Sequence, residues 1–132
     1  MIEWKEDFSV GVNELDEQHK SLFGHLNHLS QAIEQKDSLS LNYLVTVLEI
    51  YTLFHLTFEE HLLAKHGYPD FQAHEKEHDR FKEKVAKFKA QLSDDKDRLA
   101  VEIRDYLQDW IVNHILRVDK KYSSFLMEKL SQ

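Results

Sequence analysis

Four long amphipathic segments, joined by links of about four residues, most limit how this chain can fold. The spacing of apolar residues predicts helices over residues 13–34, 40–65, 70–92 and 97–115 or beyond, followed by a shorter apolar stretch over 122–130. Links this short make successive helices run antiparallel. We therefore expect an all-α fold, an up-down-up-down antiparallel four-helix bundle with an irregular N-terminal arm and a short C-terminal helix.

The composition supports this fold and excludes several classes of function. Three glycines and one proline allow few tight turns, and the absence of cysteine excludes disulfides, thiolate metal sites and cysteine nucleophiles. A formal net charge of -7 argues against nucleic acid and anionic membranes as partners. The acidic N-terminus does not resemble a targeting segment, and no apolar run approaches the ~20 residues that span a bilayer. We expect a cytoplasmic protein, with a monomer favoured.

Histidine is the unusual residue of this chain, which contains nine. With about 100° of rotation per residue, five of the nine fall on the apolar faces of the predicted helices, together with one glutamate. These inward-facing residues come from all four helices and are His19, His55, Glu59, His74, His78 and His114. His25 and His28 also form an i,i+3 pair, but their positions on the first helix predict solvent exposure.

The six inward-facing residues together favour a metal site. One buried histidine is ordinary, but each unpaired polar group in a core costs roughly 1–3 kcal/mol, so five imidazoles and a carboxylate need a cation to satisfy them. His55 and Glu59 form an i,i+4 pair, as do His74 and His78. This spacing places two ligands one turn apart on the same helix face.

Asp119 is an ambiguous seventh candidate. It follows His114 by five residues, which rotates it about 140° away on an ideal helix. Either the helix widens between Ile115 and Asp119, as a π-bulge would do, or Asp119 is a solvated residue of a polar run. Spacing alone leaves both interpretations open.

The ordered motifs of the chain resemble the hemerythrin family, in the single-domain bacterial form (bacteriohemerythrin). The resemblance covers nearly the whole chain, implies a single hemerythrin-like domain over residues 1–132, and fills every ligand position of the family's di-iron set. The motifs that carry it are Ser9-Val10-Gly11-Val12, Asp16-Glu17-Gln18-His19-Lys20, His55-x3-Glu59-Glu60, Gly67-Tyr68-Pro69, His74-x3-His78 and Trp110-Ile111-Val112-Asn113-His114-x4-Asp119.

The resemblance implies two iron ions and assigns their ligands. His74, His78 and His114 would hold one iron, His19 and His55 the other, and Glu59 and Asp119 would bridge the two. With an oxo or hydroxo bridge from solvent, these ligands fill all but one position of two six-coordinate irons. The open position on a redox metal is where a small molecule binds. The expected ligand is dioxygen, bound reversibly for storage, delivery or sensing.

We expect the pocket around that position to be formed by Phe23, Tyr51, Trp110 and Ile111. Ile111 lies one turn before His114, where a β-branched apolar side chain would exclude water.

Two alternative functions use the same residues. A di-iron peroxidase or oxidase would need an acid or base over the open position, and Tyr51 is the only proton donor predicted there. An iron-buffering protein or regulatory interaction module would instead release its metal readily. The predominance of neutral imidazole over carboxylate favours reversible binding and hence a protein that is not an enzyme, because ferritin-like di-iron proteins use mostly carboxylates.

Overall fold

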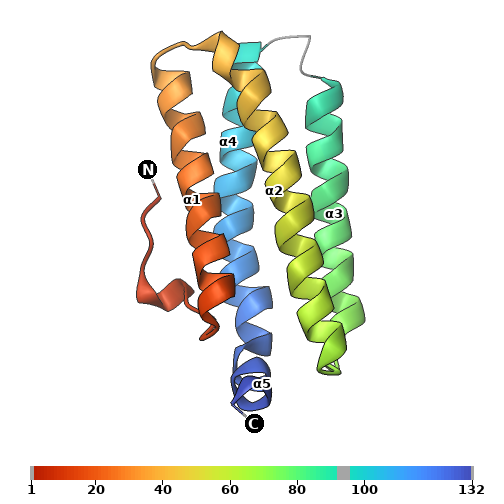
Figure 1. Cartoon of the computed structure of the whole chain (residues 1–132). Coiled ribbons are helices and arrows are strands. Elements are labelled where there is room, and N and C mark those ends of the chain that lie inside the picture. The colour runs from red at the N-terminus through yellow and green to blue at the C-terminus, as the bar shows by residue number, and fades with distance from the viewer. Residues whose placement is uncertain (1, 92–95, 132) are drawn as a thin grey trace.

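The computed structural model describes residues 2–91 and 96–131, and the regular elements of these residues are all helical. Four long helices lie side by side as the predicted up-down-up-down bundle, with α2 between α1 and α3 (Figure 1). The elements are η1 (Glu6–Phe8), α1 (Asn13–Glu34), α2 (Ser38–Lys65), α3 (Phe71–Ala90), α4 (Lys96–Asn113), η2 (His114–Asp119) and α5 (Lys120–Leu130). The predicted fold class is therefore confirmed.

The helix ends differ from the prediction where local hydrogen bonds decide them. The first helix matches the prediction at both ends. The second begins at Ser38, two residues earlier than predicted, because the Asp37 carboxylate caps it by accepting bonds from the backbone N–H and the hydroxyl of Ser40. The third ends at Ala90, and its predicted end at residue 92 lies outside the described residues.

The fourth helix continues without a break into the short C-terminal one. The predicted C-terminal helix starts at Lys120, directly after the π-helical segment η2, which joins it to α4. The last two helices of the prediction are thus one long helix with a widened turn between them.

The apolar core is divided into two clusters. The larger one fills most of the bundle and includes Leu22, Leu56 and Phe81. The smaller one lies towards the other end of the helices and includes Leu15 and Leu63. His19 lies between Leu15 and Leu22 along α1, and Glu59 lies between Leu56 and Leu63 along α2. A layer of buried polar side chains therefore separates the two apolar clusters.

The N-terminal arm runs beside α1 (Figure 1), from Ile2, which bonds to Asn27, to Val10 in the smaller cluster. The Asp16 carboxylate accepts bonds from the backbone N–H of Val10 and the hydroxyl of Ser9, and the Val10 carbonyl accepts one from Ser123 in α5. Gly11 has a φ of 78°, and a Cβ there would collide with Met127, so glycine is required where the arm meets α5. The arm thereby fixes α5 against α1.

Among the described residues, no helix is both long enough and apolar enough to cross a membrane.

Candidate metal centre

All seven candidate ligands meet in the polar layer between the two apolar clusters. Each is at most 3% exposed. One of the seven is on α1, and α2, α3 and the η2 segment carry two each. The set is His19, His55, Glu59, His74, His78, His114 and Asp119. Residues separated by up to 100 positions in sequence therefore converge at one buried place.

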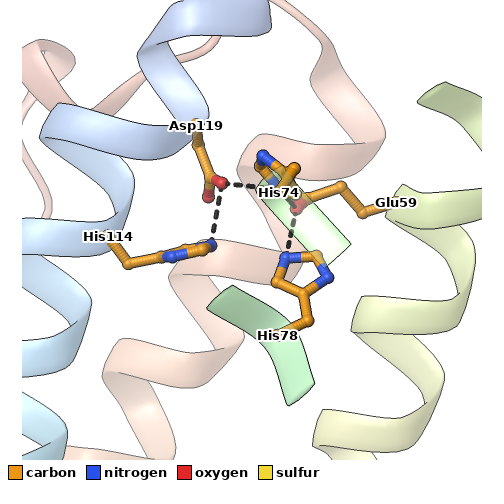
Figure 2. A group of neighbouring side chains, drawn as sticks. All are labelled: Glu59, His74, His78, His114 and Asp119. Atoms are coloured by element: carbon orange, nitrogen blue, oxygen red, sulfur yellow. Dashed lines mark hydrogen bonds and ion pairs between the residues drawn. The ribbon is translucent and has the colours of Figure 1, made fainter. Parts of the chain in front are cut away.

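Five of these side chains form one group, drawn in Figure 2. Oε1 of Glu59 lies 2.5 Å from Nε2 of His74 and 2.9 Å from Nε2 of His78. Oδ1 of Asp119 lies 2.9 Å from Nε2 of His114 and 3.2 Å from Nε2 of His74. Three imidazoles thus point their Nε2 atoms at one oxygen from each of two carboxylates.

His19 and His55 form a second group that includes Glu59 again. Oε2 of Glu59 lies 3.6 Å from Nε2 of His55 and 3.7 Å from Nε2 of His19. Oδ2 of Asp119 lies 3.1 Å from Nε2 of His19. Each carboxylate therefore turns one oxygen towards the three-histidine group and the other towards the two-histidine group.

The η2 segment brings Asp119 into this arrangement. Its π-helical turns contain more residues than α-helical ones, so a residue five positions after His114 returns to the same helix face. Of the two interpretations that the sequence left open for Asp119, the structure has the widened helix. Asp119 is fully buried rather than solvated.

Three further polar side chains hold the candidate ligands in place. Nδ1 of His55 lies 2.6 Å from Oε1 of Gln18, and Nδ1 of His78 lies 3.0 Å from Oε1 of Glu60. The Tyr122 hydroxyl donates a 2.8 Å bond to Oε2 of Glu59. With Nδ1 protonated and bonded in this way, each imidazole keeps the lone pair on Nε2 for a metal.

The sequence prediction missed these three roles, although each residue was within reach. Gln18 and Glu60 are direct neighbours of His19 and Glu59, and Tyr122 follows Asp119 by three residues. A search for residues one turn from a ligand, extended to polar side chains of α5, would have found Tyr122.

The electrostatics show how strongly the buried groups depend on one another. Burial opposes protonation of His19 and His74, but the carboxylates of Asp119 and Glu59 outweigh it and raise their pKa values to about 9 and about 10. The nearest carboxylate oxygen to Nε2 of His55 is that of Glu59 at 3.6 Å, beyond hydrogen-bond distance, and burial lowers the pKa of His55 to about 4. Burial also opposes ionisation of Glu59 and Asp119, yet the surrounding histidines hold both carboxyl pKa values well below their usual range.

Orphaned polar atoms indicate that these residues fit a metal centre. Nε2 of His19, His55 and His114 and both oxygens of Asp119 are buried and make no hydrogen bond of good geometry within the described residues. Such atoms are costly in a core unless something satisfies them. The donor set is five imidazole nitrogens and two carboxylates in two groups that share Glu59, which is a chemistry suited to two iron ions.

The residues predicted to form the pocket have different surroundings. The Trp110 ring stacks on His114 at 4.3 Å between centroids, and the Tyr51 ring stacks on His55 at 5.9 Å. The Phe23 ring contacts Phe8 at 5.0 Å and Trp4 at 5.7 Å between centroids. Ile111 lies in α4, and its side chain lies outside the described part of the chain.

Of the two histidines predicted to face solvent, His28 is exposed and His25 is not. The other two histidines outside the candidate set are His61, which is exposed, and His66, which is half-buried. His25 was expected in solvent but is half-buried, with its ring edge-on to Tyr51 at 5.2 Å. Its place on the flank of α1 faces the neighbouring α2, and the bulky Tyr51 ring covers it there.

Most of the chain is similar to known proteins of one family. The family profile described as the hemerythrin HHE cation binding domain matches residues 10–126. The chain is 30% identical to the bacteriohemerythrin of Stenotrophomonas maltophilia over 132 residues, which are 100% of this chain and 86% of that protein. It is 35% identical to the myohemerythrin of Theromyzon tessulatum over 124 residues, 94% of this chain and 92% of that one.

The fold has a matching counterpart among solved structures. A crystal structure of wild-type hemerythrin superimposes with a TM-score of 0.85 at 28% sequence identity, covering 96% of this chain and 98% of that one.

Proposed function

The chain belongs to the hemerythrin family and binds dioxygen at a di-iron centre, and we propose that the seven buried side chains hold that centre for reversible oxygen storage, delivery or sensing. One observation carries the assignment. Glu59 and Asp119 each turn one oxygen to His74 or His114 and the other to His19. This is the arrangement of two carboxylates that bridge a pair of metals.

The proposed ligands divide as the two groups do. His74, His78 and His114 would hold one iron and His19 and His55 the other, with Glu59 and Asp119 shared between them. The two-histidine group offers one ligand fewer, so an iron held there would keep a position for a small molecule. When bound, the pair of irons supplies the electrons that reversible dioxygen binding requires.

The residues around the ligands set their geometry and exclude water. Gln18 and Glu60 fix the ring orientation of His55 and His78, and the Tyr122 hydroxyl holds one oxygen of Glu59. The rings of Tyr51 and Trp110 cover His55 and His114. In the proposed pocket, Tyr51 and Trp110, together with Phe23 and Ile111, would give apolar surroundings to the bound small molecule.

The phenol groups near the centre favour oxygen binding over catalysis, because they exchange protons poorly. The two phenols that approach the centre are Tyr51 and Tyr122, and burial raises the pKa of both, so neither exchanges protons readily near neutral pH. This argues against the peroxidase or oxidase alternative, which would need an acid or base that exchanges protons beside the bound small molecule. The iron-buffering alternative conflicts with the complete burial of the ligands, because a buffer must release its metal easily.

An absorption spectrum of the reduced, iron-loaded protein tests the proposed function. We expect a new visible charge-transfer band when air is admitted and its loss when oxygen is removed under argon. The band should survive repeated cycles. Oxidation to a stable diferric spectrum with no reversible band would contradict reversible binding.

A turnover assay separates binding from catalysis in the same preparation. With hydrogen peroxide and an organic reductant, we expect no more oxidation of the reductant than an equal amount of free iron gives. Sustained turnover would instead favour the peroxidase alternative.

A further inference from the structure

The outer face of α2 is apolar and exposed, which is unusual for this chain. Four large side chains on it are exposed to between 51% and 69% of their area, namely Tyr43, Ile50, Leu53 and Phe54. Val47 is half-buried beside them. The opposite, buried face of the same helix carries His55 and Glu59 among apolar residues. Apart from these candidate ligands, both faces of α2 are therefore apolar. A helix that is apolar all round is normally buried.

This outer face also carries no charge over several turns. Its seven positions are Tyr43, Thr46, Val47, Ile50, Leu53, Phe54 and Thr57, in a chain of which 31% of the residues are charged. The exposed positions of α3, in contrast, include Lys76, Asp79 and Arg80. On the outer face of α2, another acidic molecule could therefore approach without repulsion between like charges at these positions.

The sizes of the side chains at these seven positions point to the identity of the partner. The positions lie three, four and seven residues before and after Ile50, so Ile50 is the centre of the face. If a second α2 packs antiparallel about a twofold axis through Ile50, then Tyr43 faces Thr57 of the other copy. In the same register, Thr46 faces Phe54 and Val47 faces Leu53. Each large side chain meets a smaller one, as close packing requires.

A parallel pair of α2 helices would pack less well. It would place Tyr43 against Tyr43 and Phe54 against Phe54, where two large side chains meet. It would also place Thr46 against Thr46 and Thr57 against Thr57, where two small ones meet. The antiparallel pair also places opposite ends of the two helix dipoles together.

The exposed area is sufficient for a specific contact. The four large side chains expose roughly 500 Å² per chain, which is at the upper end for a single apolar patch on a monomer. Two copies would bury about 1,000 Å² from these side chains alone, which reaches the minimum for a specific interface.

We propose that the outer face of α2, centred on Ile50, is the interface of a homodimer in which two copies of this chain pack their α2 helices antiparallel. The partner is a second copy because the face is complementary to itself about Ile50. This proposal replaces the monomer favoured from the sequence, which took no account of how α2 is exposed.

Sedimentation equilibrium of the iron-loaded protein tests the proposal. The parent chain should have twice the chain mass of 15.8 kDa at high concentration. Ile50→Glu places two carboxylates at the twofold axis and should give a monomer with an unchanged iron content. Val101→Glu changes an exposed apolar residue of α4 and should leave the dimer intact.

Opposite charges should restore the contact. Ile50→Lys alone should be monomeric, and an equimolar mixture of Ile50→Lys and Ile50→Glu should give a dimer containing one of each. A parent chain that is monomeric at every concentration would overturn the proposal, as would an Ile50→Glu variant that remains dimeric.

Disulfide cross-linking tests the direction of packing, since the chain has no cysteine of its own. Under mild oxidation Ile50→Cys should cross-link to itself. Tyr43→Cys should not, because antiparallel packing separates the two copies of that residue by about 21 Å along the helices. A mixture of Tyr43→Cys and Thr57→Cys should cross-link. Efficient cross-linking of Tyr43→Cys alone would mean parallel packing and would overturn the proposed geometry.

Discussion

The surroundings of individual histidines distinguish a ligand from an ordinary side chain in this protein. His74 is buried between the carboxylates of Glu59 and Asp119, whereas His28 is exposed on the outer side of α1. Both are histidines on amphipathic helices, and the difference between them is entirely their neighbours. A pair of single substitutions can therefore separate the site from the surface.

We predict that His74→Ala loses iron and destabilises the fold, while His28→Ala does neither. Removing the His74 imidazole leaves Glu59 and Asp119 with less compensation for their buried charges, which costs about 3–5 kcal/mol in comparable buried pairs. Metal analysis and urea unfolding of the metal-free proteins measure the two effects. Equal iron retention in both variants would refute the assignment of His74 to the centre.

The pKa values of the buried histidines predict how the metal-free protein responds to pH. His19 and His74 have pKa values of about 9 and about 10 in the fold, above the ordinary 6.5. Their stabilising contribution is therefore fully present below pH 6.5 and is lost as the pH rises through 9 to 10. His55, with a pKa of about 4, acts in the opposite sense and destabilises the fold as the pH falls from 6.5 towards 4.

We thus expect the urea midpoint of the metal-free protein to fall between pH 7 and pH 10. In the iron-loaded protein these imidazoles are deprotonated ligands, so the alkaline loss should be much smaller. The comparison needs one unfolding series for each form. A midpoint that stays constant up to pH 10 without metal would show that His19 and His74 do not carry protons in the fold.

At the scale of the helices, the π-helical segment decides whether Asp119, the seventh candidate ligand, can reach the other six. An α-helix would carry Asp119 about 140° away from His114, and η2 removes that rotation. The segment leads directly into α5, whose Tyr122 donates a hydrogen bond to Glu59. One local change of helix type therefore positions both Asp119 and Tyr122.

We predict that Asp119→Ala loses the iron pair, while Asp109→Ala keeps it. Asp109 is an exposed residue of α4 whose carboxylate accepts a bond from Asn113, so its loss leaves the buried layer intact. Iron content and the visible spectrum of the two variants decide the matter. An unchanged spectrum in Asp119→Ala would mean that the i+5 residue is not a bridge.

The sequence predicted the helices well because their apolar periodicity is long and regular. It predicted the first and last residues of α1 correctly. It could not predict the first residue of α2, because that depends on the side-chain cap made by Asp37. Five histidines and Glu59 could be assigned to the interior from rotation alone. Asp119 could not, because an ideal α-helix rotates it about 140° away from His114 and the apolar spacing does not show that the helix widens at η2.

The polar side chains that hold the imidazoles of the candidate ligands were also harder to predict. Gln18 contacts His55 from a different helix, and Glu60 contacts His78 across α2 and α3. Such partners depend on how the helices are rotated against each other. A single sequence gives the period of each helix and not the register between them.

At the scale of the whole molecule, the polar layer links all parts of the bundle. It lies between two apolar clusters and draws ligands from α1, α2, α3 and η2, so bound metal would cross-link every long segment of the chain. The protein surrounds that layer with aromatic rings and with Gln18 and Glu60 as orienting groups. In the proposed function, the centre would consequently be both the functional site and a structural support.

The ratio of oxygen to iron tests this account most directly. Iron per chain and the oxygen released on evacuation should be measured on one air-equilibrated sample of the reduced protein. Two irons per chain and one molecule of dioxygen recovered for every two irons, taken up again when air returns, is the result that we predict. One iron per chain, or iron that is oxidised without any recoverable oxygen, would contradict a reversible di-iron centre held by these seven residues.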